Sequence, residues 1–265
     1  MLKNLRISFA AIFFAGLTLL FLGIGRDWWG WMAKLQLLPA CIRLASGALA
    51  GNIAIVAGIL ALTLVFGRIY CSVICPMGVY QDAVLWVRKT LSRSFPKNRS
   101  LQKRFSFSKE RRWLRLSVAA LCIISAFVCG QLLISILAPY SAYGRMVRAV
   151  STLAAGNAST ALLGSAAVTF VTITLCAWVW GRAWCNTICP VGTLLGLISQ
   201  AAFLRLNINE DKCISCGQCA RNCKASCIDM KNHKVDGSRC VNCFDCIGNC
   251  REGAITYSFH HKKAE

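Results

Sequence analysis

Residues 213–223 read Cys-Ile-Ser-Cys-Gly-Gln-Cys-Ala-Arg-Asn-Cys, and residues 240–250 read Cys-Val-Asn-Cys-Phe-Asp-Cys-Ile-Gly-Asn-Cys. Both segments carry four cysteines in the order C-x2-C-x2-C-x3-C, which is the spacing of a domain that holds two iron–sulfur cubes. The short spacing lets three thiolates of one loop reach three corners of a cube, and the fourth cysteine ligates the other cube. Zinc is the competing metal for thiolates, but zinc folds normally use paired C-x2-C units. The spacing therefore favours iron–sulfur clusters.

We predict that residues 207–265 form an α+β domain of the two-cluster bacterial ferredoxin type, with two [4Fe–4S] clusters. The predicted ligands of the first cluster are Cys213, Cys216, Cys219 and Cys250. The predicted ligands of the second cluster are Cys240, Cys243, Cys246 and Cys223.

Two features of this tail depart from the usual pattern. Lys224 and Arg251 stand where a proline normally follows the fourth cysteine, and positive charge near a cluster is expected to raise its reduction potential. Cys227 is a ninth candidate ligand. It aligns with Ala254 in the other half of the tail, so we expect a small packing residue there.

The rest of the chain is strongly apolar. Hydrophobic residues make up 56% of the sequence and charged residues only 15%, and the two kinds are segregated. Four stretches reach the roughly 17–25 apolar residues that cross a bilayer: residues 7–24, 49–66, 113–138 and 161–180. We interpret the first as an uncleaved signal anchor, because its apolar run is long and no Ala-x-Ala-like site follows. Arg115, near the start of the third, is expected to snorkel.

The net charge of +20 follows the expected topology. Residues 88–115 contain eleven lysines and arginines against one acid, Glu110, whereas the connections 25–48 and 138–160 contain few basic residues. This asymmetry is the positive-inside pattern, and it places both termini and the cysteine-rich tail in the cytoplasm of a bacterial inner membrane. Contact with the lipid bilayer explains the basic run, so we predict no nucleic-acid partner. Structural disulfides rarely persist on that reducing side, which again favours metal.

An internal repeat organises the membrane part. Gly67-Arg-Ile-Tyr-Cys-Ser-Val-Ile-Cys-Pro-Met-Gly matches Gly181-Arg-Ala-Trp-Cys-Asn-Thr-Ile-Cys-Pro-Val-Gly, so the repeats cover residues 67–82 and 181–196. Each copy ends a predicted hairpin of two spans, and a shorter apolar stretch follows it, at 79–91 and 191–206. We therefore predict that residues 1–206 form a membrane α-helical domain of four transmembrane helices, arranged as two repeated hairpins.

With these motifs in view, the chain resembles the NapH-type membrane ferredoxins, the quinol dehydrogenase components of periplasmic nitrate reductase systems. It also resembles the related membrane module of the NosR-type polyferredoxins. The resemblance covers almost the whole chain through Cys71, Cys75 and Pro76, through Cys185, Cys189 and Pro190, and through the eight tail cysteines. It implies electron transfer between the quinone pool and another redox protein or membrane subunit, with the chain as one electron-transfer component of a membrane oxidoreductase.

Three interpretations remain for the cysteines of the two C-x3-C-P elements, which are Cys71, Cys75, Cys185 and Cys189. On a helix, residues i and i+4 share one face, so four sulfurs from two repeats are able to meet and form a third metal centre or a reversible dithiol pair. Alternatively, the prolines end the helices and the cysteines only pack there. Our hypothesis is a redox-active site between a quinone and the tail clusters.

Arginines precede both cysteine pairs. Arg68 and Arg182 are explained by positive-inside placement at the inner surface, and the alternative is that they bind a quinone oxygen or lower the pKa of a nearby thiol. Trp28, Trp29 and Trp31 predict an interfacial aromatic belt, with a quinone pocket there as the alternative.

The sequence leaves three functions open. The favoured one is an inner-membrane electron-transfer protein that links the quinone pool to a redox partner. The second is a membrane reductase that acts as an assembly or maturation factor for a metal- or flavin-containing partner. The third is a redox sensor. All three use the same cysteines.

Overall fold

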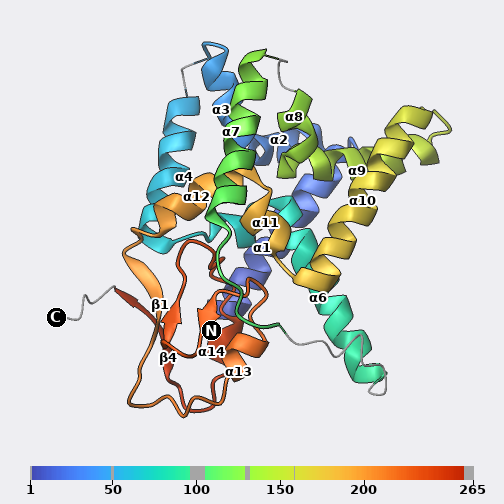
Figure 1. Ribbon diagram of the computed structural model, residues 1–265. Coiled ribbons are helices and arrows are strands. Elements are labelled where there is room, and N and C mark those ends of the chain that lie inside the picture. The colour runs from blue at the N-terminus through green and yellow to red at the C-terminus, as the bar shows by residue number, and fades with distance from the viewer. Residues whose placement is uncertain (1, 49–50, 96–104, 129–131, 158, 260–265) are drawn as a thin grey trace.

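The structure is a computed structural model, and it describes residues 2–48, 51–95, 105–128, 132–157 and 159–259. Helices dominate the first three quarters of the chain, and short strands with two small helices form the last quarter (Figure 1). The elements are α1 Leu2–Phe21, α2 Arg26–Lys34, α3 Leu37–Ala45, α4 Asn52–Phe66, α5 Tyr70–Val73, α6 Pro76–Ser94, α7 Arg112–Val128, α8 Leu132–Leu137, α9 Pro139–Ala154, α10 Thr160–Trp180, α11 Ala183–Thr187, α12 Pro190–Ser199, β1 Leu204–Ile208, α13 Gln218–Arg221, β2 Ile228–Asp229, β3 Lys234–Val235, α14 Asp245–Asn249 and β4 Ile255–Phe259.

Two described helices, α1 and α10, are long and apolar enough to cross a membrane. Only 22% of the most apolar part of α1 and 17% of that of α10 are buried within the protein. A helix that is apolar on all sides is normally buried by its neighbours or by lipid. Large apolar side chains such as Ile12, Phe170 and Leu175 are instead exposed along these helices. The two helices therefore indicate a membrane protein.

The other two predicted spans look different in the structure. α4 is a 15-residue apolar helix, about 22 Å long at 1.5 Å per residue and so shorter than a hydrocarbon core of about 30 Å. The predicted span 113–138 includes residues 129–131, which lie outside the described residues; α7 and α8 are the described helices on either side of them. Four transmembrane helices thus stay a proposal.

The two sequence repeats adopt the same local structure. In each copy a long helix (α4 or α10) ends at a glycine with positive φ, Gly67 or Gly181. A short helix (α5 or α11) follows and carries the first cysteine. The second cysteine, Cys75 or Cys189, then precedes a further helix (α6 or α12) as its N-cap residue in an extended conformation.

This local structure corrects two expectations. The prolines do not end helices; Pro76 and Pro190 begin α6 and α12, where a residue without an N–H costs no intrahelical bond. The two cysteines of each pair also do not share one continuous helix, because the second cysteine is itself the extended N-cap residue of the next helix. The glycines end the preceding helices because a left-handed backbone conformation is easy only for a residue without Cβ.

The tail is built from two small antiparallel sheets. Strand β1 pairs with β4 with Leu204 opposite Phe259 and Ile208 opposite Ile255, and β2 pairs with β3. The stretch 191–206, expected as one apolar helix, is divided here: α12 ends at Ser199 and β1 begins at Leu204. Residues 204–206 consequently pack with the tail, and the domain boundary expected between 206 and 207 falls inside β1.

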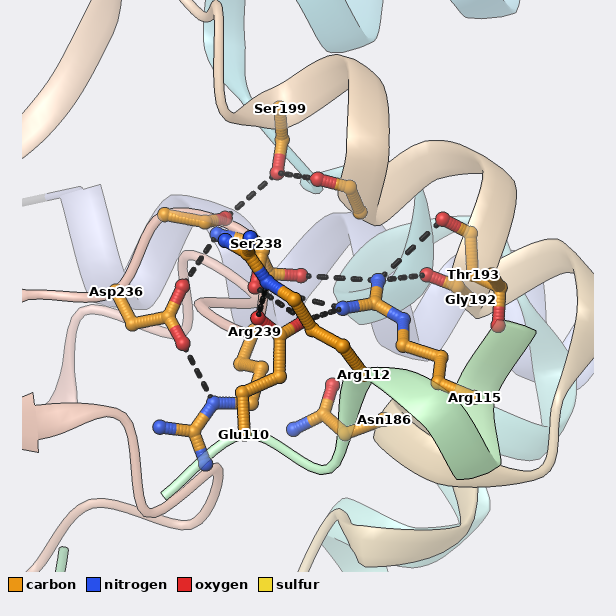
Figure 2. Close-up of polar contacts among 12 residues, drawn as sticks. Glu110, Arg112, Arg115, Asn186, Gly192, Thr193, Ser199, Asp236, Ser238 and Arg239 are labelled. Carbon is orange, nitrogen blue, oxygen red and sulfur yellow. Dashed lines mark hydrogen bonds and ion pairs between the residues drawn. The ribbon is translucent and has the colours of Figure 1, made fainter. Parts of the chain in front are cut away.

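A buried polar contact joins the tail to the helices. Arg115 of α7 is 2% exposed and does not snorkel to the surface, contrary to expectation. Its guanidinium group donates to Glu110 Oε1 and to the carbonyl oxygens of Gly192 and Ser238 (Figure 2). A buried charge is costly unless it is paired and hydrogen-bonded. The Arg115 guanidinium group therefore holds these three acceptors, which come from three segments of the chain, close together. The tail therefore docks on α12 in a fixed position.

Side chains of the tail also cap the C-terminal end of α4. The Tyr257 hydroxyl donates to the Phe66 carbonyl over 2.8 Å, and the Asn242 side-chain amide donates to the same oxygen. The last carbonyls of a helix lack intrahelical partners, and here side chains of the tail provide them.

Candidate metal centres

The predicted ligands of the first cluster line a single cavity. Its volume is about 270 Å³, and all four thiols, of Cys213, Cys216, Cys219 and Cys250, are on its wall. The remaining wall is mostly apolar and includes Ile208. This donor set, four free thiols in an apolar setting, suits an iron–sulfur cube, which is bound by cysteine thiolates.

The predicted ligands of the second cluster line a second, smaller cavity of about 20 Å³. Its wall contains Cys223, Cys240, Cys243 and Cys246, and also Cys227. The thiols around this cavity suit an iron–sulfur cube, and the argument for a cube here depends on these thiols and not on the volume of the cavity. Each cavity thus draws three thiols from one C-x2-C-x2-C loop and the fourth from the other, which is the crossed pairing that the spacing predicts.

Cys227 lies beside the second ligand set. It is 1% exposed, like its counterpart Ala254, and its Sγ is 3.5 Å from Cys223 Sγ. Deep burial agrees with a packing role, but the short sulfur–sulfur distance also keeps it within reach of the cavity.

The two cysteine loops have matching backbones. Ser215 and Asn242, each one residue before the second cysteine of its loop, both have positive φ, at 52° and 48°. The residue after that cysteine, Gly217 or Phe244, is also left-handed and caps the short helix that follows. Left-handed conformations of non-glycine residues cost energy and collect at ligand sites. The same costly backbone conformations at matching positions support the same ligand-binding role for the two loops.

The repeated C-x3-C-P cysteines come together at the tail side of the helices. Cys71, Cys75 and Cys189 belong to one buried core, and the thiol of Cys185 is close enough to influence the pKa of Cys75 and Cys189. Burial raises the pKa of the Cys75, Cys185 and Cys189 thiols, and the neighbouring thiols raise it further. The structure thus brings together four sulfurs that lie far apart in sequence.

Each repeat holds the other through an arginine. Arg182 Nη1 donates to the Cys71 carbonyl over 2.9 Å, and Arg68 Nη2 donates to the Cys185 carbonyl over 3.3 Å. The same Nη2 of Arg68 is 3.9 Å from Cys71 Sγ. Both arginines are fully buried. They therefore lie against the four-thiol site, and their position relative to a membrane surface stays a prediction.

Two glycines make this close approach possible. A methyl group on Gly78 would overlap the carbonyl oxygen of Cys71 and approach the Arg182 guanidinium. A methyl group on Gly192 would overlap the carbonyl oxygen of Cys185 and approach the guanidinium group of Arg68. The glycine three residues after each second cysteine is consequently required by packing.

A single carboxylate collects three cations beside this site. Asp82 of α6 pairs with Arg6, Arg182 and Lys224 at 2.8, 2.8 and 3.3 Å. Burial alone raises the pKa of Asp82, but these charges, Arg182 first, outweigh it and hold the pKa well below its ordinary value. Lys224 continues to Asp245 at 2.7 Å, so its charge is compensated by two acids. The sequence pattern gave no sign of Asp82, since only its tertiary neighbours distinguish it from other acids.

The four-thiol site packs directly against the second cysteine loop. Val241 is buried in the same core as Cys71 and Cys75, and Cys243 packs on that core. Gln81, fully buried, accepts from the Cys185 thiol over 3.3 Å, and its Nε2 has no hydrogen-bond partner among the residues that the structure describes. Arg68 Nε is likewise without a partner. Two buried donors thus remain free next to the sulfurs.

Other cysteine and aromatic candidates lie elsewhere. Cys122 is buried in α7, and Cys41 and Cys176 are half-buried in α3 and α10. Trp28 is 82% exposed on α2.

In the described part of the chain, no three His, Cys, Asp or Glu side chains are arranged to hold a single metal ion. A cube is bonded at its corners, so its ligands need not converge on one point.

Comparisons with known proteins agree with this geometry. The sequence pattern of a 4Fe-4S binding domain matches residues 49–94 and 162–209, and a second 4Fe-4S binding domain pattern matches residues 206–229. The methylamine utilization ferredoxin-type protein MauN of Paracoccus denitrificans is 32% identical over 176 residues, which are 66% of this chain and 54% of MauN. The ferredoxin-type protein NapH of Escherichia coli is 28% identical over 185 residues, 68% of this chain and 56% of NapH. No solved structure matches.

Two loops of thiols around two cavities, together with the matching 4Fe-4S patterns, define a ferredoxin-type iron–sulfur protein of electron transport. The chain is a relative of the NapH- and MauN-type ferredoxin proteins, as the resemblance implied. It spans about half the length of these curated relatives.

Proposed function

We propose that this chain passes single electrons between the quinone pool and a second redox protein at the bacterial inner membrane. The eight tail cysteines hold two [4Fe–4S] clusters, which supply the one-electron chemistry when bound. The observation that carries the proposal is the crossed arrangement, in which Cys250 joins the first cavity and Cys223 the second.

The protein residues have defined tasks in this function. The thiolates anchor each cluster, and the apolar walls of the cavities keep water away from it. Lys224 and Asp245 adjoin ligands of the second cluster, and their ion pair fixes the charge near it. Arg251 is exposed next to a ligand of the first. Because local charge tunes the potential of a cluster, the two centres are expected to differ in potential.

The proposed orientation places the tail in the cytoplasm and four helical segments in the membrane. Its support is the distribution of charge. Lys3, Arg6 and Lys89 line one surface cavity with Lys224 and Asp245 of the tail, and Lys109 and Arg111 line another with Ser226. Basic residues thus lie on the tail side of the helices, as the positive-inside rule expects.

We further propose that Cys71, Cys75, Cys185 and Cys189 hold a third redox centre between the quinone and the tail clusters. The matching 4Fe-4S pattern at 49–94 and 162–209 contains both cysteine pairs, which supports this role. The free donors of Gln81 and Arg68 support it too, since an anionic sulfur centre would accept from them. Packing alone would leave these buried donors unsatisfied.

Iron analysis and paramagnetic resonance of the reduced, purified protein test both proposals. Two cubes give about eight iron atoms per chain and three give about twelve. The double variant Cys71→Ser, Cys185→Ser is expected to lose one centre and keep the two tail signals. An unchanged iron content and unchanged electron transfer in this variant would reject the third centre. Cys176→Ser, in α10, is the control.

Reduction by quinol tests the link to the quinone pool. A short-chain quinol added to membranes is expected to reduce the tail clusters within the time of one turnover of the electron-transfer reaction. Clusters that never respond to quinol, together with a partner enzyme that lacks its metal or flavin when this chain is deleted, would favour the maturation factor. A cluster state that alters a partner without steady turnover would favour the sensor.

A further inference from the structure

A groove runs between α1 and α6 and ends at the tail. Its volume is about 340 Å³. One part of the wall is apolar and consists of side chains from both helices, among them Ile7, Ala11, Phe14, Val79 and Trp86. Because only 22% of the most apolar part of α1 is buried, this part of the groove would face hydrocarbon where α1 crosses a membrane.

The other end of the groove is charged with both signs. Its cations belong to Lys3, Arg6, Lys89 and Lys224, and its carboxylates to Asp82 and Asp245. Arg6 is 7% exposed and lines the groove, and in the described part of the chain its Nε has no hydrogen-bond partner although Nη1 pairs with Asp82. A buried donor without a partner at the wall of a cavity points to an acceptor that a ligand supplies.

The charged end lies beside two redox sites. Lys224 directly follows Cys223, and Asp245 directly precedes Cys246, so both flank ligands of the second cluster. Asp82 pairs with Arg182, which donates to Cys71 of the four-thiol site. A molecule bound at this end contacts groups that adjoin both centres.

The chemistry of the groove selects its ligand. An apolar wall and a polar end require a molecule with an apolar body and a compact polar head. A phosphodiester head group would be attracted by the four cations, but it only accepts hydrogen bonds and has no hydrogen to donate to Asp82 or Asp245. A quinol head both donates and accepts: its hydroxyl groups donate to a carboxylate, and its oxygen accepts from Arg6 Nε.

We propose that the groove between α1 and α6 binds the head group of a membrane quinol, with Arg6 and Asp82 as its polar contacts. This inference rests on the proposed link to the quinone pool and gives that link a place. Oxidation of the quinol to quinone would release two electrons, which clusters held by the tail cysteines would accept one at a time, and two protons, which would leave to water at the charged end of the groove. This site makes the alternative of a quinone pocket at Trp28, Trp29 and Trp31 unnecessary.

Photo-crosslinking tests the site without relying on turnover. A short-chain azidoquinone is illuminated with the purified holoprotein, and the labelled peptides are mapped by mass spectrometry. Label is expected in α1 and α6 and is expected to be displaced by decylubiquinone. Label in other segments only, or bound phospholipid that decylubiquinone does not displace, would overturn the assignment.

Filling the groove provides the matched variants. Ala11→Phe of α1 and Ala83→Phe of α6 place a ring in the groove from exposed positions. Ala57→Phe of α4 adds the same ring at an exposed position outside the lining. The concentration of decylubiquinone that halves the label is expected to rise about tenfold in the first two and to stay unchanged in the third.

Measurement of cluster reduction by quinol distinguishes a failure of the groove assignment from a failure of the proposed quinol dehydrogenase function. If quinol reduces the wild-type clusters but Ala11→Phe and Ala83→Phe behave like Ala57→Phe, the groove is wrong and the quinone link stands. If azidoquinone labels the groove but quinol never reduces the clusters, the binding site stands and the quinol dehydrogenase function fails.

Discussion

The guanidinium of Arg182 donates a hydrogen bond of 2.9 Å to the main-chain carbonyl of Cys71, 111 residues earlier in the chain. Arg68 makes the equivalent contact to the Cys185 carbonyl. The two sequence repeats are therefore interlocked, and each supplies the cation that fixes the cysteine turn of the other. Because both arginines are buried, the contacts hold the four thiols in one place.

Removal of the Arg182 guanidinium is expected to destabilise the protein strongly. Arg182→Met takes one cation from Asp82 and the donor from the Cys71 carbonyl, and loss of one partner of a buried ion pair typically costs about 3–5 kcal/mol. Thermal unfolding in detergent measures the effect. The control Arg93→Met, at an exposed position in the last turn of α6, should change the midpoint little. Equal midpoints for the two variants would show that the interlock is not needed for stability.

Addition of one methyl group at Gly192 is expected to disturb the cysteine turn. In Gly192→Ala the new Cβ overlaps the Cys185 carbonyl, and overpacking of this kind costs about 1–3 kcal/mol. Gly58→Ala in α4 is the matched control, because a Cβ there has no atom within 4 Å. Alanine is also the better helix former, so Gly58→Ala should be neutral or stabilising by up to about 1 kcal/mol. Unfolding midpoints that move together in the two variants would contradict the packing argument.

The pH dependence of stability should report on Asp82. Its pKa is lowered in the folded protein, despite burial, by Arg182, Lys224 and Arg6, so ionised Asp82 stabilises the fold at pH values above the unfolded pKa of about 3.9. That stabilisation is lost progressively as the pH falls below about 5. In Asp82→Asn the free energy of unfolding should be lower near neutral pH, and its decline with acid should be shallower.

Denaturant unfolding between pH 7 and the acid range measures this difference. Asp27→Asn, at an exposed position in the first turn of α2, should keep the wild-type pH profile. A profile for Asp82→Asn that runs parallel to the wild type would mean that Asp82 does not contribute through its charge.

The crossed ligation has a spectroscopic consequence. Cys250 lines the first cavity with Cys213, although it belongs to the second sequence loop. Cys250→Ser should therefore alter the same reduced-cluster signal as Cys213→Ser and leave the signal altered by Cys240→Ser intact. Paramagnetic resonance of the three variants decides the pairing. Coincidence of the Cys250→Ser and Cys240→Ser effects would indicate that each loop binds its cluster alone.

The sequence was most informative where a function depends on local spacing. The C-x2-C-x2-C-x3-C order predicted which thiols line which cavity, because a short loop can reach three corners of a cube only with that spacing. The two repeats were also visible in sequence, and they adopt the same turn. The resemblance to NapH-type ferredoxins is confirmed by the relatives.

The sequence was misleading where a residue's role depends on distant neighbours. Arg115 was expected to snorkel, yet acceptors from three segments bury it. The cysteine pairs were expected on one helical face, but the proline begins a helix and leaves the second cysteine extended. The pattern of apolar residues predicted four spans; among the described helices α1 and α10 are long and apolar enough to cross a membrane, and four spans stay a prediction.

By itself, then, the sequence predicted the chemistry of the tail, because the spacing of the cysteines in the two loops is that of a 4Fe-4S binding domain. Only the tertiary structure decided that the C-x3-C-P cysteines meet, that Asp82 pairs with Arg6, Arg182 and Lys224, and that a groove runs from α1 to Lys224 and Asp245 of the tail. These features join residues that are far apart in sequence, by 76 positions for Arg6 and Asp82 and by 142 for Asp82 and Lys224. Buried charges and packed carbonyls specify such contacts only when the whole fold has removed water from around them.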